Sequence, residues 1–172
     1  MKELYLPAIF SVLFVSILNA HAQQIQSLEP YTEADVGDIY YLPFVDDPVY
    51  KIYNKGFIPQ YYQVKGGYIG GRKKILAEFK EKVGVDVYSS IDGFVTIRFI
   101  VNCEGKAGRF RILMLDKEYR QRNFDRFFID KLLCFTNSLS NWKVASINGT
   151  KTDYYQYITF VINGTKVSDI MP

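Results

Sequence analysis

The stretch that decides the fold, residues 93–105, reads GFVTIRFIVNCEG. Apolar side chains alternate in it for four periods, which is the spacing of a strand with one buried face. The turn-forming composition of 102–105 and a second alternating run at 109–114 predict a β-hairpin. One face of this hairpin is dry. The other carries Arg98, Arg109 and Arg111, and we call it the arginine face.

Three more elements surround the hairpin. Apolar residues at helical spacing predict one helix over 72–83, ending near Gly84, and a second over about 121–141. An alternating run predicts a third strand, Tyr154–Ile162, at or near a sheet edge and ending at the turn-forming pair Asn163-Gly164. The order helix, strand, strand, helix, strand indicates an α+β fold, with two helices packed on one face of a small antiparallel sheet.

The first residues predict export. Lys2 precedes an apolar run that is too short to span a membrane, and Ala20-His21-Ala22 fits a signal-peptidase site. Residues 1–22 are therefore expected to be a cleaved signal peptide, and the protein to be periplasmic or secreted. We divide the remainder into an acidic, Tyr-rich N-terminal extension (23–65), an α+β domain (66–165) and a tail (166–172).

Charge is distributed unevenly along the chain. Residues 23–50 contain six acidic and no basic residues, whereas residues 51–172 contain 20 basic and 11 acidic residues. Opposite signs favour docking of the extension on the domain. Two apolar runs within it, 39–42 and 50–53, have the composition of short strands. A solvated extension is the alternative reading.

Little in the chain indicates catalysis. Cleavage removes the only histidine, His21, and with it Ser-His and Cys-His catalysis and every His-bearing zinc site. We expect no metal, no cofactor, no small-molecule substrate and no nucleic-acid partner. Cys103 and Cys134 are the only cysteines, and in an exported protein such a pair favours a disulfide, with two buried thiols as the alternative.

Four motifs resemble the TonB C-terminal domain family, in the style of its orphan members in Bacteroidetes-type bacteria. They are Tyr68-Ile69-Gly70-Gly71, the hairpin 93–105, Trp142 followed by Asn148-Gly149, and the strand 157–162. Val144 stands where the family has a proline. The family's transducers also carry an uncleaved anchor and a long Pro-rich spacer, whereas here the N-terminal apolar segment is expected to be cleaved and the extension contains few prolines.

The resemblance implies a noncatalytic module that binds an extended peptide or envelope protein by strand addition at a sheet edge. The predicted partner-binding residues are Tyr154, Tyr155, Gln156, Tyr157, Ile158, Thr159 and Phe160, with Arg109 and Arg111 steering an acidic partner. An open edge also allows a homodimer. Two alternatives stay open: a carboxylate-only hydrolase of the envelope, and a self-capped structural protein whose acidic extension covers its own edge.

Overall fold

The structure, a computed structural model, describes residues 37–54, 56–84 and 92–171, all within one compact unit of the chain. The predicted signal peptide lies outside the described residues. The elements are a 3-10 turn η1 (Tyr61–Gln63), two helices, α1 (Gly71–Lys82) and α2 (Arg126–Ser138), and six strands, β1 (Gly93–Val101), β2 (Ala107–Asp116), β3 (Ala145–Ile147), β4 (Thr150–Thr152), β5 (Tyr154–Asn163) and β6 (Lys166–Met171). The predicted α+β class is confirmed.

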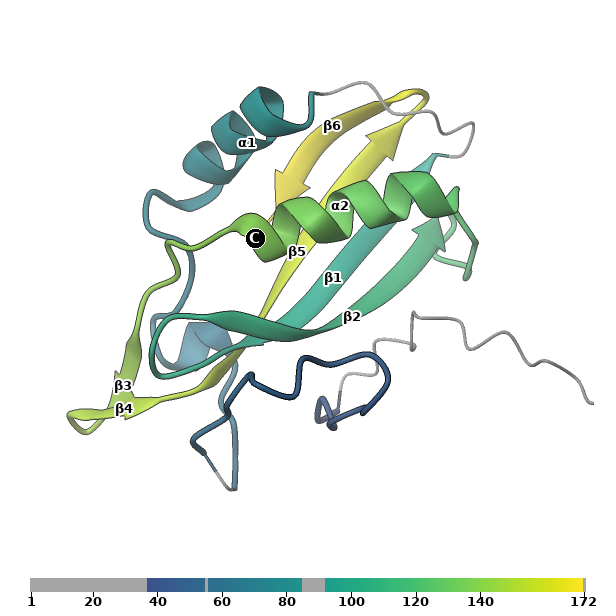
Figure 1. Ribbon diagram of the computed structural model, residues 1–172. Helices are drawn as coiled ribbons and strands as arrows, with labels where there is room; N and C mark the ends of the chain where they lie inside the picture. Colours follow the sequence, from purple (N-terminus) through teal and green to yellow (C-terminus); the bar gives the residue numbers. More distant parts are fainter. Residues whose placement is uncertain (1–36, 55, 85–91, 172) are drawn as a thin grey trace, which may run out of the picture. The chain divides into compact units, whose positions relative to one another are not determined.

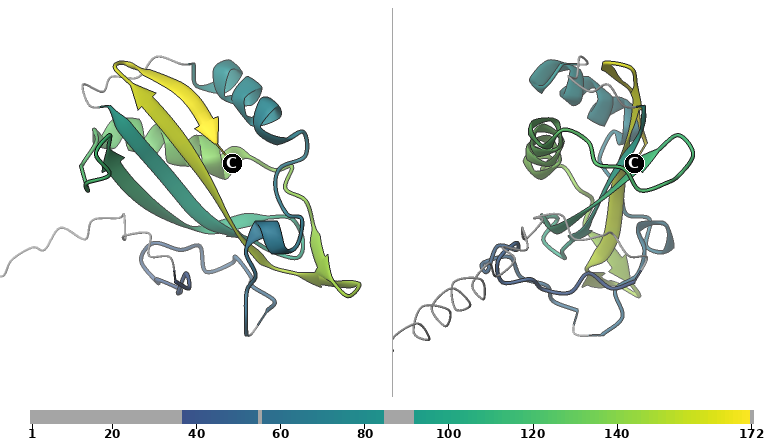
Figure 2. Two further views of the ribbon diagram at one scale, coloured as in Figure 1. Left: turned by 180° about the vertical axis from the view of Figure 1, so that it is seen from behind. Right: turned by 90° about the vertical axis from the view of Figure 1, so that its right-hand side faces the viewer.

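One antiparallel sheet organises the domain. Its strand order is β2-β1-β5-β6, and β1 pairs with β5 at nine consecutive positions. The predicted buried face of β1 is confirmed, since Val95, Ile97 and Phe99 are fully buried in the main core. Both helices lie on this side of the sheet (Figures 1 and 2).

The two helices are held by their own apolar rows and by local signals. In α1, Ile75 and Phe79 are fully buried, and the helix ends one residue before its predicted end. Helix α2 is shorter than predicted. Its start is fixed by Asp125, whose carboxylate accepts the Phe128 N–H at 3.0 Å, and its end by the extended conformation of Leu139.

Two Asn-Gly turns extend the sheet structure. Asn148 and Gly149 both have positive φ, as a two-residue hairpin turn requires, and they join β3 to β4 in a separate two-stranded ribbon. The turn after Asn163 joins β5 to β6. Residues 166–171 are therefore an edge strand, and the prediction of a tail is wrong. A run of only six residues, with Val167 and Ile170 as its buried side chains, gave too weak an alternation to be recognised.

The described part of the N-terminal extension docks on the domain. Ile39 is buried against Ile100 and Tyr155, on the side of the sheet away from the helices. The short strands predicted at 39–42 and 50–53 are not formed, since these residues carry no strand assignment. The extension is held by side chains of the sheet instead of by a backbone ladder.

Candidate functional site

The predicted binding strand, β5, is not an open edge. Its inner side pairs with β1 along its whole length, and its outer side pairs with β6 from Thr159 to Asn163. Further towards its start, the Tyr155 N–H donates to the Pro59 carbonyl at 2.8 Å, and Gln60 forms a parallel bridge there. The prediction of a free edge at 154–160 is therefore wrong, because the chain's own segments occupy both ends of it.

The side chains of β5 divide between two environments. Tyr154, Ile158 and Phe160 are fully buried in the main core, and Gln156 is 1% exposed. Tyr155 is covered by the extension. Among the predicted partner-binding residues on β5, Tyr157 and Thr159 remain partly exposed. Tyr157 and Thr159 therefore form a narrow accessible strip on β5, which we call the binding strip.

The arginine face holds the extension. Arg111 forms a two-bond fork with Asp46, at 2.8 Å for each Nη–Oδ pair, and its Nη2 also donates to the Tyr40 carbonyl at 2.6 Å. The ion pair is shielded from solvent, since the Arg111 side chain is 6% exposed and the Asp46 side chain is 2% exposed. Arg98 Nη1 donates to the Gly37 carbonyl at 2.5 Å. The acidic segment that Arg111 binds in the structure is a part of the same chain.

Electrostatics keep Asp46 charged. Burial raises the pKa of its carboxyl, but hydrogen bonds from Arg111 and from the Leu42 N–H, together with the charges of Arg111 and Arg109, bring the pKa below its usual value. The same carboxylate closes the turn 42–46, because the Leu42 N–H donates to Oδ2 at 2.7 Å and the Asp46 N–H donates to the Leu42 carbonyl at 2.9 Å. This turn leaves Phe44 90% exposed.

Asp153, which the sequence analysis did not predict as a structural residue, anchors two other segments of the chain. It lies fully buried just before β5, and its Oδ2 accepts the N–H groups of Tyr53 and Asn54, each at 2.6 Å. Its Oδ1 accepts the Cys103 N–H at 2.8 Å. One carboxylate thus joins the extension, the tip of the β1–β2 hairpin and the start of β5. A single Asp between Thr152 and Tyr154 carries no sequence signal of such a role.

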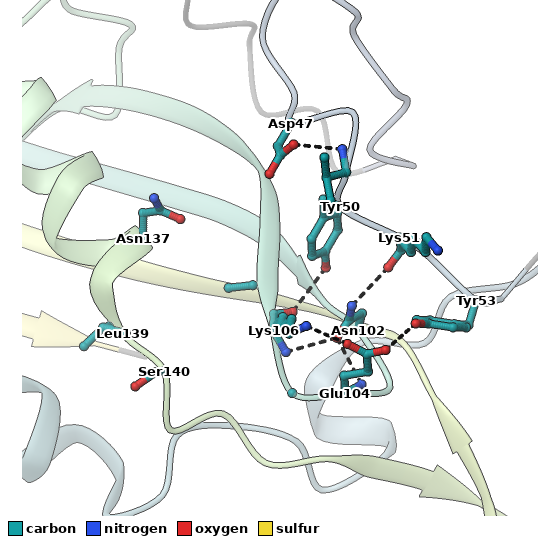
Figure 3. Close-up of a pocket in the computed structure, with 13 residues that line it drawn as sticks. Asp47, Tyr50, Lys51, Tyr53, Asn102, Glu104, Lys106, Asn137, Leu139 and Ser140 are labelled. Atoms are coloured by element: carbon teal, nitrogen blue, oxygen red, sulfur yellow. Dashed lines mark hydrogen bonds and ion pairs between the residues drawn. The ribbon is translucent and has the colours of Figure 1, made fainter.

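A pocket of about 600 Å³ opens beside the hairpin tip (Figure 3). Its lining comes from the extension, the tip and the end of α2: Asp47, Val49, Tyr50, Lys51, Tyr53, Asn102, Glu104, Gly105, Lys106, Ala107, Asn137, Leu139 and Ser140. Lys106 and Tyr53 both hydrogen-bond Glu104 and lower the pKa of its carboxyl. The Glu104 contact in turn raises the pKa of Tyr53 to about 12. The pocket therefore presents an ionised carboxylate and a protonated phenol.

The two cysteines are unbonded in the structure, and the disulfide between them stays a prediction. Cys103 lies at the hairpin tip beside Asp153, and Cys134 is exposed on α2, where it lines a different pocket with Lys82 and Lys131. A disulfide requires its two Cα atoms to lie within about 7 Å. Spacing along the sequence carried no information on that distance.

Comparison of the chain with known protein families, with curated proteins and with solved structures finds no match. The likeness to the TonB C-terminal domain is therefore a sequence-based expectation. Within the described ranges, no helix is long and apolar enough to cross a membrane. The same residues contain no group of three or more His, Cys, Asp or Glu side chains that would hold a metal ion.

Proposed function

We propose that this chain is a noncatalytic protein-interaction module of the cell envelope, which binds an extended segment of a partner protein by strand addition along the outer side of β5. One observation carries the proposal: β6 occupies that side at only five register positions, with an irregularity at Val161–Ile162, whereas β1 occupies the inner side at nine. The strand in the binding position is the shortest one in the sheet.

The contacts of β6 are of a kind that a competing strand replaces readily. Arg72 pairs with Asp169 and donates to the Ile170 carbonyl at 3.1 Å. The side chains of Arg72 and Asp169 are 54% and 29% exposed, and exposed ion pairs contribute about 0–1 kcal/mol to the free energy of unfolding. Val167 and Ile170 are buried, so a departing β6 would leave two apolar side-chain sites for an incoming strand.

A structural protein that caps its own edge is the second candidate, and the filled outer side of β5 favours it. The cap would be β6 with Pro59 and Gln60, and not Asp46 of the extension, which binds Arg111 on the arginine face. The hydrolase alternative gains no support. Such an enzyme needs a carboxyl group with a raised pKa as its acid, and the pKa of Glu104 in the pocket is lowered.

Site-specific photocrosslinking in the native cell separates the first two candidates. A photoreactive residue is placed at Tyr157 or Met171, beside the proposed binding strip, and at Phe127, which is exposed on α2. We expect a discrete adduct from the first two positions and none from Phe127, with a several-fold higher yield when Arg72→Ala loosens β6. Absence of adducts at 157 and 171, or equal adducts at 127, would contradict strand addition and favour the self-capped protein.

A further inference from the structure

The arginine face brings three positive charges close together on one side of the sheet. Arg98 on β1 lies directly opposite Arg111 on β2 in the register, and Arg109 is two residues away. Like charges at opposed positions destabilise a strand pair. Arg98 and Arg111 are also buried, at 8% and 5% exposure. An acidic, carbonyl-rich segment that covers the face offsets this repulsion.

The covering segment is recognised mostly through its backbone. The carbonyls of Gly37, Ile39 and Tyr40 accept hydrogen bonds from the three arginines. Three side chains of the segment also contact the sheet: Ile39 is 6% exposed, Asp38 accepts the Tyr155 hydroxyl at 2.9 Å, and the centroid of the Tyr41 ring lies 5.4 Å from Arg109 Cζ. Tyr40 is 74% exposed. The required pattern is an acid followed by an apolar residue, in an extended chain, with a second acid for the Arg111 fork.

Arg109 shows that the extension fills this site incompletely. Its Nη1 reaches the Ile39 carbonyl only at 3.4 Å, and its buried Nε has no hydrogen-bond partner among the described residues. Arg109 also lies at the irregularity between β1 and β2 with a φ of 57°, a left-handed conformation that costs energy for a residue other than glycine. A strained backbone therefore holds the Arg109 side chain against the extension, while its Nε–H donates no hydrogen bond to the described residues.

We propose that the arginine face is a second peptide-binding site, independent of the β5 edge, for an extended acidic segment of a partner protein. The chain's own residues 37–46 occupy it as an internal ligand. A partner segment competes with them by placing a carboxylate or carbonyl oxygen at Arg109 Nε as well as a carboxylate at Arg111. The apparent dissociation constant for the partner equals the intrinsic one divided by the fraction of chains in which the extension is undocked.

The probe is a fluorescent synthetic peptide with the sequence of residues 37–47, titrated into the full-length chain and followed by anisotropy. Asp46→Asn in the protein removes the charge that occupies the Arg111 fork, so we expect this variant to bind the peptide at least tenfold more tightly than the wild type. Adding Arg109→Leu to the variant should weaken binding at least fivefold. Equal affinities for wild type and variant, or no binding to either, would overturn the proposal.

Hydrogen exchange decides the question if Asp46→Asn does not fold. Competition requires the extension to detach while the sheet stays intact. The amides of Val45 and Asp46, which donate to the Leu42 carbonyl, should therefore exchange at least tenfold faster than those of Val95 and Ile97 in β1. Equal protection of the two sets would show that the extension opens only with the whole domain, and would refute the proposal.

Discussion

Truncation of Asp153 tests the reasoning about how the extension is held. The carboxylate accepts three backbone N–H groups from two other segments, and it is fully buried. A buried N–H that loses its partner costs about 1–3 kcal/mol. Water can reach the partly exposed Tyr53 and Asn54 once the side chain is removed. We therefore expect Asp153→Ala to cost about 3–4 kcal/mol, near the lower end of that sum.

The assay is equilibrium unfolding in urea. With a slope near 2 kcal/mol per M, a loss of this size lowers the midpoint by about 1.5–2 M. Asp47→Asn is the matched control, because this exposed carboxylate accepts only the Val49 N–H within its own turn, and its loss should cost less than about 0.5 kcal/mol. A cost below about 1 kcal/mol for Asp153→Ala would refute the assignment of Asp153 as the shared anchor.

Three further predictions concern the ion pair of Asp46 with Arg111, the packing of Tyr50 on Gly108, and the ion pair of Arg72 with Asp169 of β6. Since the folded-state pKa of Asp46 is lowered, its ion pair with Arg111 should stabilise the fold above pH about 4 and lose that effect as the pH falls further. The free energy of unfolding is measured against pH for the wild type and for Asp46→Asn, and the two curves should converge in acid. Gly108→Ala should cost about 1–3 kcal/mol in thermal unfolding, because the new methyl would meet the Tyr50 ring at 2.6 Å; an unchanged melting temperature would contradict this packing. Arg72→Ala should cost less than about 1 kcal/mol in urea, and a larger loss would mean that β6 is too firmly held to exchange with a partner strand.

The sequence predicted those parts of the fold that rest on periodicity. The hairpin around Val95 and Ile97 and the row of Phe128 and Leu132 in α2 each repeat one spacing long enough to be unambiguous. Strand β6 was missed because six residues carry too short a repeat. Its absence from the prediction moved the sheet edge by one strand, so the outer side of β5, predicted to be free, is occupied by β6 from Thr159 to Asn163.

The site itself was predictable only in its charge. Opposite signs indicated that the acidic extension would dock on the basic domain, and the fork of Asp46 on Arg111 agrees with that expectation. The location was not predictable, because the pair joins residues 65 positions apart through the sheet. The same limit applies to Asp153, whose three partners lie 50 to 100 positions away. Such contacts depend on the completed fold and leave no local pattern.

The separation of these partners has a consequence for the order of folding. Ribosomes deliver the extension first, yet Ile39 needs Tyr155 and Tyr53 needs Asp153, which are synthesised more than ninety residues later. Contacts that close such long loops form late. During synthesis the extension must therefore wait, uncovered, until nearly the whole chain has emerged. Its docking marks the completion of the domain, and protease resistance of residues 37–54 would serve as the last milestone of maturation.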